Sequence, residues 1–304
     1  MTHPTFNEPD RVGRFALART GLAVAAGLAA RLPPAASDER RVLLLLVDVQ
    51  VDFVHADGAL SVPGAVDDTR RTIAWLFDHE AEIGHIAASL DSHVPLQIFF
   101  PTWWADSEGR PPEPYTAITA QQVKAGRWQP LYEPDWSLDY VKQLQSQAKK
   151  DLMIWPFHTL LGTPGHSLTP ALYEAVAYHA AARGYQPTIV TKGLIAKTEY
   201  YSLLEPEVKV PGVPGGELNR SFLQQLASFD LIYAAGQAKS HCVLETVQSI
   251  LRHAPDLAPR LRLLEDACSP VSHPDIDFAR LADEAFSRFA AQGVGRVTTR
   301  DPIG

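Results

Sequence analysis

The sequence predicts an α/β protein with a mostly parallel central sheet covered by helices. Two observations carry this prediction. Continuous apolar runs without helical or alternating period recur along the chain, and segments of helical periodicity lie between them. Repeated alternation of this kind is typical of βαβ units joined by right-handed crossovers. The chain has 304 residues, 46% of them hydrophobic and 20% charged, so it is long enough to bury a large core.

The expected strands are the apolar runs, taken in chain order. The first, RVLLLLVDV at 41–49, fits a strand buried on both faces and begins the main domain, 41–304. Further runs of the same kind lie at 83–90, 187–191, 229–236, 261–267 and 294–299. Helical periodicity predicts helices at 66–82, 168–184, 218–227, 240–253 and 274–291.

Two segments do not fit this alternation. Residues 1–40 contain the apolar stretch GLAVAAGLAA, which allows two interpretations: a secretory signal, or a helix that packs on the domain or on a second subunit. The stretch is too short to span a bilayer and Arg31 follows it directly, so we expect a helical N-terminal extension. The segment 99–150 is rich in Pro, Trp and Tyr, and we expect an insertion after the second strand that forms a lid or an interface.

Charge and cysteine content limit the class of partner. The net charge of −8 argues against nucleic acid or an anionic membrane surface, since both require clustered Lys and Arg, and favours a small-molecule substrate. Cys242 and Cys268 are the only cysteines, too few for a disulfide framework or a thiolate zinc site. We therefore expect free thiols in a reducing compartment, the cytoplasm.

Polar residues follow four of the apolar runs. In open parallel sheets ligands bind beyond the carboxyl ends of the strands, so these residues are the first candidates for a site. They are Asp48, Asp91 with His93, Lys192, and the turn 236–242 that leads to Cys242. The pattern predicts that four strand ends converge on one crevice.

Cys242, Asp48 and Lys192 suit nucleophilic catalysis. A helix N-terminus or a nearby cation lowers the pKa of a thiol, and we expect both at Cys242. A carboxylate can take the thiol proton and pass it to a leaving amine, and an ammonium group can keep that carboxylate ionised. Taken singly, the alternatives are a buried structural cysteine, an N-capping aspartate and a lysine at a strand end.

Asp91, His93 and His158 suit a metal site. Residues two apart in an extended segment point the same way, so Asp91 and His93 could bind one ion, with His158 as a third ligand. Such a set suits zinc, manganese or iron. The alternative for each histidine is a local hydrogen bond. We place His241 among the structural histidines, because adjacent residues at a helix start point in different directions.

Six motifs together resemble the isochorismatase-like cysteine hydrolases, and among them the nicotinamidase/pyrazinamidase type. They occur in the order found in that family and are VDVQVDF (47–53), LDSH (90–93), WPFHTLLGTPG (155–165), TKG (191–193), GQAKSHCV (236–243) and DACSPVS (266–272). The resemblance implies a three-layer α/β/α fold. It also implies that the N-terminal extension and the segment 99–150 are additions to a shorter common domain.

The resemblance implies the catalytic roles as well. Asp48, Lys192 and Cys242 match the catalytic triad, with Cys242 attacking a carboxamide to give a thioester and ammonia. The backbone amides of Ala238 and Cys242 match the oxyanion hole, and a cis peptide would fall at Gln237-Ala238.

For the remaining positions, the resemblance implies a metal, zinc first and manganese or iron as alternatives, at Asp91, His93 and His158. It implies that the substrate ring lies between Phe53 and Trp155, with Tyr200 closing the pocket. The family commonly adds a further histidine or acid soon after the D-x-H, where this chain offers only Gln97.

The function we expect is that of a cysteine amidohydrolase acting on a small aromatic or heteroaromatic carboxamide. We also expect the protein to form a homo-oligomer. Two alternatives stay open. One is another hydrolase of the superfamily, acting on an N-carbamoyl amide or on isochorismate. The other is a non-catalytic member that binds a small molecule or a partner.

Overall fold

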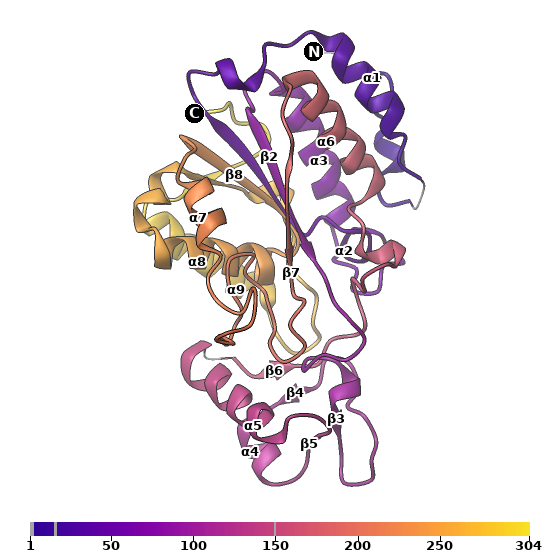
Figure 1. Cartoon of the computed structure of the whole chain (residues 1–304), viewed down its shortest axis with the longest axis vertical. Coiled ribbons are helices and arrows are strands. Elements are labelled where there is room, and N and C mark those ends of the chain that lie inside the picture. Colours follow the sequence, from indigo (N-terminus) through magenta and orange to yellow (C-terminus); the bar gives the residue numbers. More distant parts are fainter. Residues whose placement is uncertain (1–2, 15–16, 149) are drawn as a thin grey trace.

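A six-stranded parallel sheet forms the centre of the computed structural model, which describes residues 3–14, 17–148 and 150–304 (Figure 1). The strand order is β10-β9-β8-β1-β2-β7, and every neighbouring pair is parallel. The strands are β1 (Val42–Val47), β2 (His85–Asp91), β7 (Thr188–Lys192), β8 (Leu231–Gly236), β9 (Leu261–Leu264) and β10 (Gly295–Val297). The predicted parallel α/β architecture is confirmed.

Helices cover both faces of the sheet and make three layers (Figure 1). One face carries α3 (Ala65–Asp78) and α6 (Pro170–Arg183); the other carries α7 (Arg220–Leu226), α8 (Leu244–His253) and α9 (Phe278–Ala291). Alternate residues of β1 enter separate cores, Leu44 and Leu46 on the first face and Leu43 and Leu45 on the second. A strand buried on both sides needs apolar residues throughout, which explains the unbroken run.

The N-terminal extension packs on the outside of α6 through α1 (Thr20–Ala30) (Figure 1). Gly27 allows the close approach of the two helices, since a Cβ there would collide with the carbonyl oxygen of Tyr178. Glu174, a buried residue of α6, accepts hydrogen bonds at 2.7 and 2.8 Å from Arg11 and at 2.6 Å from the backbone N–H of Arg19. Hydrogen bonds to a buried carboxylate, as well as helix packing, therefore hold the extension on α6.

The segment between Phe99 and Lys150 forms a small lobe beside one end of the sheet (Figure 1). Its elements are β3 (Trp104–Ala105), β4 (Ala117–Ile118), β5 (Gln129–Pro130), α4 (Ala120–Lys124) and α5 (Pro134–Gln143), and β6 (Leu152–Met153) follows it. Two antiparallel pairs, β3 with β5 and β4 with β6, hold it together. Trp103 and Trp104 are buried, and their indole N–H groups donate to Ser137 Oγ at 2.9 Å and to Ile98 O at 2.6 Å.

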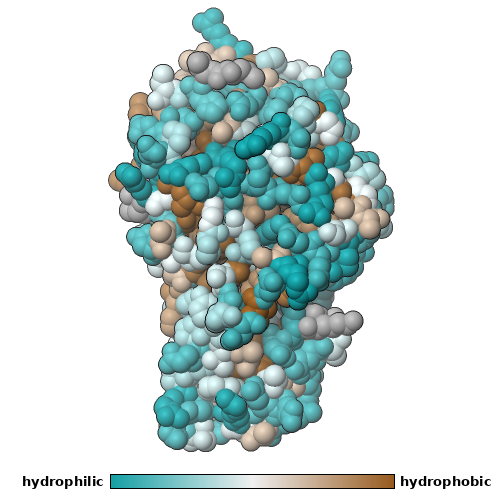
Figure 2. Space-filling view, turned by 180° about the vertical axis from the view of Figure 1, so that it is seen from behind, coloured by the Kyte–Doolittle hydropathy of each residue, from teal (hydrophilic) through white to brown (hydrophobic). Residues whose placement is uncertain are grey.

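The surface is predominantly polar on the face shown in Figure 2, with small hydrophobic areas between hydrophilic ones. Within residues 3–14, 17–148 and 150–304, we find no helix with the length and hydrophobicity needed to cross a membrane.

Candidate active site

Three side chains from distant parts of the sequence meet at the carboxyl ends of the strands. Asp48 follows β1, Lys192 ends β7, and Cys242 lies in the π-helical turn Lys239–Val243 between β8 and α8. The Nζ atom of Lys192 lies 3.0 Å from Asp48 Oδ2 and 3.6 Å from Cys242 Sγ. All three residues are buried. The three residues that the sequence singled out for catalysis thus lie close together at the strand ends.

The local backbone explains how Asp48 and Cys242 come together. Asp48 has a left-handed φ of 47°, which turns the chain sharply at the end of β1. Gly236, with φ of 124°, lies beside Val47, and a Cβ at this position would collide with the Val47 carbonyl oxygen. Ser89 on the neighbouring strand donates from Oγ to Asp48 Oδ1 at 2.6 Å and accepts the Asp48 N–H at 3.0 Å. Ser89 therefore fixes both the backbone and the side-chain carboxylate of Asp48.

The electrostatics of this group differ from the sequence-based expectation. Burial raises the pKa of the Cys242 thiol well above its usual range, Lys192 opposes that effect, and the Asp48 carboxylate reinforces it. The expectation of a lowered thiol pKa is therefore wrong, because burial outweighs the single nearby cation. Burial also favours a lowered pKa for Lys192, but the Asp48 and Asp91 carboxylates outweigh it and raise that pKa. The resting group is a neutral thiol beside an ammonium.

The turn before the thiol has the expected backbone feature. The Gln237-Ala238 peptide bond is cis. The side chain of Gln237 holds the turn in place: its Nε2 donates to Asp68 Oδ2 at 3.0 Å and its Oε1 accepts the Ser269 N–H at 3.4 Å. Ala238 and Cys242 both line one cavity.

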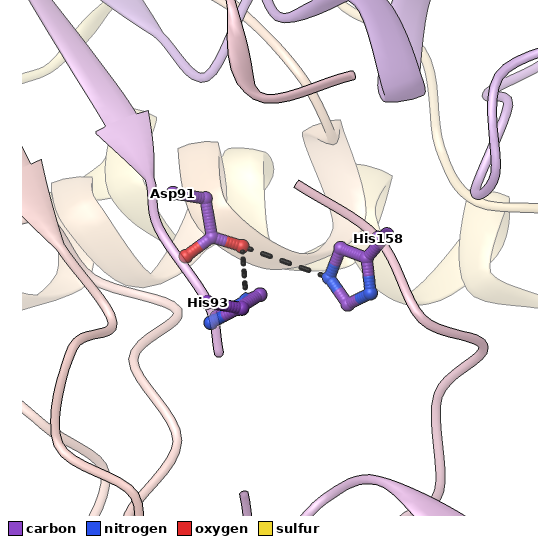
Figure 3. Close-up of side chains that lie close together, drawn as sticks. All are labelled: Asp91, His93 and His158. Atoms are coloured by element: carbon purple, nitrogen blue, oxygen red, sulfur yellow. Dashed lines mark hydrogen bonds and ion pairs between the residues drawn. The ribbon is translucent and has the colours of Figure 1, made fainter. Parts of the chain in front are cut away.

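Asp91, His93 and His158 form a buried cluster next to this group (Figure 3). Asp91 Oδ2 accepts a hydrogen bond from His93 Nε2 at 2.8 Å and lies 3.7 Å from His158 Nε2. One donor atom from each residue lies within 4.8 Å of the others. Among the described residues, this is the one cluster of three such donors.

The chemistry of the cluster fits a divalent metal ion. His158 Nδ1 lies 2.7 Å from the carbonyl oxygen of Pro156, and His93 Nδ1 lies 3.3 Å from that of Gly193. A backbone carbonyl behind a histidine fixes its tautomer and directs its other nitrogen to a metal, so the arrangement at His158 is that of a ligand. Burial favours a raised pKa for Asp91, but His93 and Lys192 outweigh it and hold that pKa well below its usual range. The carboxylate is thus ionised.

Gln97 does not complete this cluster. Its Nε2 donates to Gly193 O at 2.7 Å, and its Oε1 accepts the Val94 N–H at 3.1 Å. Both ends of the amide are therefore bound to backbone groups, one next to His93 and one next to Lys192.

A cavity of about 30 Å³ lies over the thiol. Phe53 and Trp155 are in its wall. The full set of lining residues is Phe53, Leu60, Asp91, Trp155, His158, Glu199, Tyr201, Ala238, His241, Cys242 and Val271. A larger hollow of about 680 Å³ runs along the loop after β7, but Cys242 does not line it. The small cavity is the one that joins the thiol to the metal-ligand cluster.

Tyr200 does not point into this cavity. Its hydroxyl donates to Gly215 O and it lines the larger hollow, while its backbone carbonyl accepts from Lys192 Nζ at 2.8 Å. The neighbouring Tyr201 lines the cavity instead, and its hydroxyl accepts from Trp155 Nε1 at 3.1 Å. In a loop without regular period, the sequence gives no signal to choose between two adjacent tyrosines.

The cavity wall holds two further titratable residues: Glu199, which sequence reasoning missed, and His241, which it placed among the structural histidines. Burial, reinforced by the Asp91 charge, raises the pKa of Glu199 to about 8. Burial, reinforced by Lys150, lowers the pKa of His241 to about 3. Both residues are therefore neutral near pH 7. The sequence holds no motif that would single out Glu199, whereas His241 is next to the nucleophile candidate.

Comparisons with known proteins show which proteins this chain is similar to. A nicotinamidase of Saccharomyces cerevisiae is 23% identical over 229 residues, which cover 75% of this chain and 88% of the relative. A crystal structure of the yeast nicotinamidase bound to the inhibitor nicotinaldehyde superposes with a TM-score of 0.57 at 20% identity, covering 84% of this chain and 99% of that one. A nicotinamidase/pyrazinamidase of Acinetobacter baumanii gives 0.56 at 20% identity, covering 87% and 99%.

No protein-family model matches the chain. The sequence relative and the superposed structures nevertheless point to the same proteins. The chain has the α/β fold of the solved nicotinamidase structures, and its resemblance to the nicotinamidase/pyrazinamidase type is confirmed.

Proposed function

We propose that this protein is a cysteine amidohydrolase that releases ammonia from a small aromatic or heteroaromatic carboxamide of the nicotinamide type. One observation carries the proposal: Cys242 Sγ lies 3.6 Å from Lys192 Nζ, which lies 3.0 Å from Asp48, at a cavity walled by Phe53 and Trp155. Hydrolysis of such an amide through a thioester needs a thiol, a base and a cavity wall that can contact the substrate ring. The nicotinamidase relatives support the same class of reaction.

The proposed reaction begins from the neutral thiol. Asp48 accepts the thiol proton as sulfur attacks the amide carbon, and the N–H groups of Ala238 and Cys242 stabilise the resulting oxyanion. Asp48 then passes its proton to the amide nitrogen, the C–N bond breaks, and ammonia leaves from the thioester. Asp48 next takes a proton from water, whose oxygen attacks the thioester carbon. The acid leaves and the proton returns to sulfur.

Lys192 supports these proton transfers without taking part in them. Its ammonium contacts both Asp48 and Asp91, at 3.0 and 2.8 Å, so it compensates the charge that two buried carboxylates would otherwise leave unbalanced. It is also close to the sulfur, where negative charge develops during attack.

Asp91, His93 and His158 would hold a divalent ion, with zinc as the first choice and manganese or iron as alternatives. When bound, the ion would act as a Lewis acid and orient a ring nitrogen or carbonyl of the substrate. The protein supplies the ionised carboxylate and the two imidazoles for it, and Gln97 and the backbone carbonyls keep those ligands in place.

Ammonia release from a panel of carboxamides and N-carbamoyl compounds, with and without chelator, tests this proposal. We expect Cys242→Ala to abolish release, by at least about a thousandfold. The matched control is Cys268→Ala, because Cys268 is equally buried but does not line the cavity. Full activity of Cys242→Ala on the best amide would rule out the thioester route. Release from carbamoyl compounds alone would favour the neighbouring branch of the superfamily.

The setting of the enzyme is part of the proposal. We propose a reducing, cytoplasmic location, which the two free and buried cysteines, Cys242 and Cys268, support. We also propose a homo-oligomer. The exposed leucines of the N-terminal extension, Leu17, Leu22 and Leu28, support this, and light scattering of the purified protein tests it.

A further inference from the structure

Lys150 lies where the lobe rejoins the main domain, and the proposed reaction does not use it. Its ammonium pairs with two carboxylates of the main domain, Glu207 at 3.2 Å and Glu245. The side chains of these glutamates are only 7% and 12% exposed. Burial favours a lowered pKa for Lys150, but the two carboxylates outweigh it and raise that pKa. Lys150 therefore places a full positive charge between two largely buried carboxylates.

The same ammonium lies against a residue of the cavity wall. Lys150 Nζ is 5.0 Å from the centroid of the Tyr201 ring, within the range of attraction between a cation and an aromatic face. Tyr201 lines the cavity over the thiol, and its hydroxyl accepts a hydrogen bond at 3.1 Å from Trp155, another residue of that wall. Lys150 itself lines a separate hollow of about 540 Å³, so it can influence a bound substrate only through its neighbours.

The partners of Lys150 belong to different parts of the fold. Tyr201 and Glu207 lie in the long loop between β7 and α7, whereas Glu245 lies in the first turn of α8, three residues after Cys242. One side chain thus joins the end of the lobe, the loop that carries the wall tyrosine and the helix that follows the nucleophile turn. Removal of the cation would leave Glu207 and Glu245 to repel each other.

We propose that Lys150 is a positioning residue of the candidate active site, whose ammonium holds the Tyr201 ring in the wall of the substrate cavity. Glu207 and Glu245 hold the ammonium in turn. The inference rests on the proposed amidase function, and it makes the lobe part of the unit that binds the substrate. Because Lys150 acts through the wall and not through the reacting groups, its loss weakens the binding of substrate and transition state alike, which raises KM and leaves kcat unchanged.

Steady-state kinetics of ammonia release from the best amide of the panel test the inference. We expect Lys150→Met to raise KM about tenfold and to change kcat less than about twofold. The matched control is Lys197→Met. Lys197 Nζ lies 5.0 Å from the ring centroid of Trp136 and 3.0 Å from Glu133 Oε2, both in the lobe, but none of the three residues lines the cavity. Its KM and kcat should equal those of the wild-type protein. Equal rises in KM for both variants, or a fall in kcat at constant KM for Lys150→Met, would overturn the inference.

Three further variants separate the charge from the ring. Lys150→Met leaves two carboxylates unpaired, whereas Lys150→Met/Glu207→Gln removes one charge of each sign and so protects the fold. Its KM should still be about tenfold higher. Adding Lys150→Met to Tyr201→Leu should change KM less than about twofold, since the ring is absent. Lys150→Arg should keep KM within about threefold of wild type, because a guanidinium also pairs with carboxylates and stacks on aromatic faces.

The opposite results would each contradict the inference. A wild-type KM in Lys150→Met/Glu207→Gln would show that the cation does not hold the wall. A tenfold rise that persists in Tyr201→Leu would show that Lys150 does not act through this ring. A KM for Lys150→Arg as high as that for Lys150→Met would show that the positive charge is not what matters.

Binding without turnover distinguishes this inference from the function on which it rests. Titration calorimetry on Cys242→Ala, with and without Lys150→Met/Glu207→Gln, measures Kd for pyridine-3-carboxamide. If the wild-type protein releases no ammonia but the added substitutions weaken binding about tenfold, the proposed reaction fails and the positioning role stands. If ammonia is released but the two Kd values are equal, the positioning role fails alone. If Cys242→Ala does not bind this amide, the positioning role fails too.

Discussion

Lys192→Met tests the charge balance at the centre of the candidate site. The Lys192 side chain is 1% exposed, and its ammonium lies within 3.0 Å of Asp48, of Asp91 and of the Tyr200 carbonyl oxygen. Methionine is unbranched and one atom shorter than lysine, and it removes the charge, which leaves two buried carboxylates without their shared cation. Removing one partner of a buried ion pair costs about 3–5 kcal/mol. That is a large part of the roughly 5–15 kcal/mol by which a folded protein is stable.

Urea denaturation of chelator-treated protein at pH 7 measures this effect as a free energy of unfolding. We expect the double variant Asp48→Asn/Lys192→Met to recover part of the lost stability, because it neutralises one of the two carboxylates. Neither variant should release ammonia. The matched control is Lys209→Met: that side chain is 43% exposed beside Glu205, and surface pairs contribute about 0–1 kcal/mol. Equal losses for Lys192→Met and Lys209→Met, or no recovery in the double variant, would refute the reasoning.

Three further predictions concern the metal cluster, the extension and the pH dependence of stability. His93→Ala should remove stoichiometric divalent metal from the purified protein by elemental analysis, whereas His253→Gln should not; metal retained by His93→Ala would contradict the cluster. Gly27→Val should separate α1 from α6 and expose the extension to limited proteolysis, while Gly21→Ala, on the same helix with open space around it, should not; equal protection would argue against the packing. Burial lowers the pKa of His179 from 6.5 to about 4, so the unfolded chain binds this proton more tightly. Stability should be full above pH 6.5 and fall toward pH 4, on the order of 3 kcal/mol from this residue, and His179→Phe should flatten that slope.

The fold could be read from the sequence largely because its strands are buried on both faces. The apolar run at 41–49 contains β1, and the other five runs each contain most of a strand. The strand order was not readable in the same way. Nothing in the run at 229–236 says that β8 lies beside β1, because pairing between distant strands depends on how the helices pack. The strands of the lobe after Phe99 have two residues each, too few for any periodicity to show.

The site residues that follow strand ends could be predicted from the sequence. Those whose positions depend on a loop conformation could not. Asp48 and Lys192 take their places from β1 and β7, and the distance between them follows from the sheet. Tyr201, Glu199 and His241 take theirs from irregular segments, in which side-chain direction depends on the loop conformation. The prediction of a lowered thiol pKa was wrong for a related reason. The sequence shows which charges are near Cys242, but not how completely the sulfur is buried.

The size of the cavity indicates which part of the wall moves when substrate enters. Ligand pockets usually measure about 300–1,000 Å³, whereas this cavity holds about 30 Å³. A ring therefore cannot enter unless a wall is displaced. Trp155 donates a hydrogen bond to the Tyr201 hydroxyl, and Phe53 belongs to the short helix α2 (Val51–Val54). Val271, in contrast, lies in a loop with exposed neighbours, and its backbone N–H donates to Ser240 Oγ.

Segments with few buried contacts open at the lowest free energy. We therefore expect the loop of Val271 to be displaced first, which would break the hydrogen bond from the Val271 N–H to Ser240 Oγ.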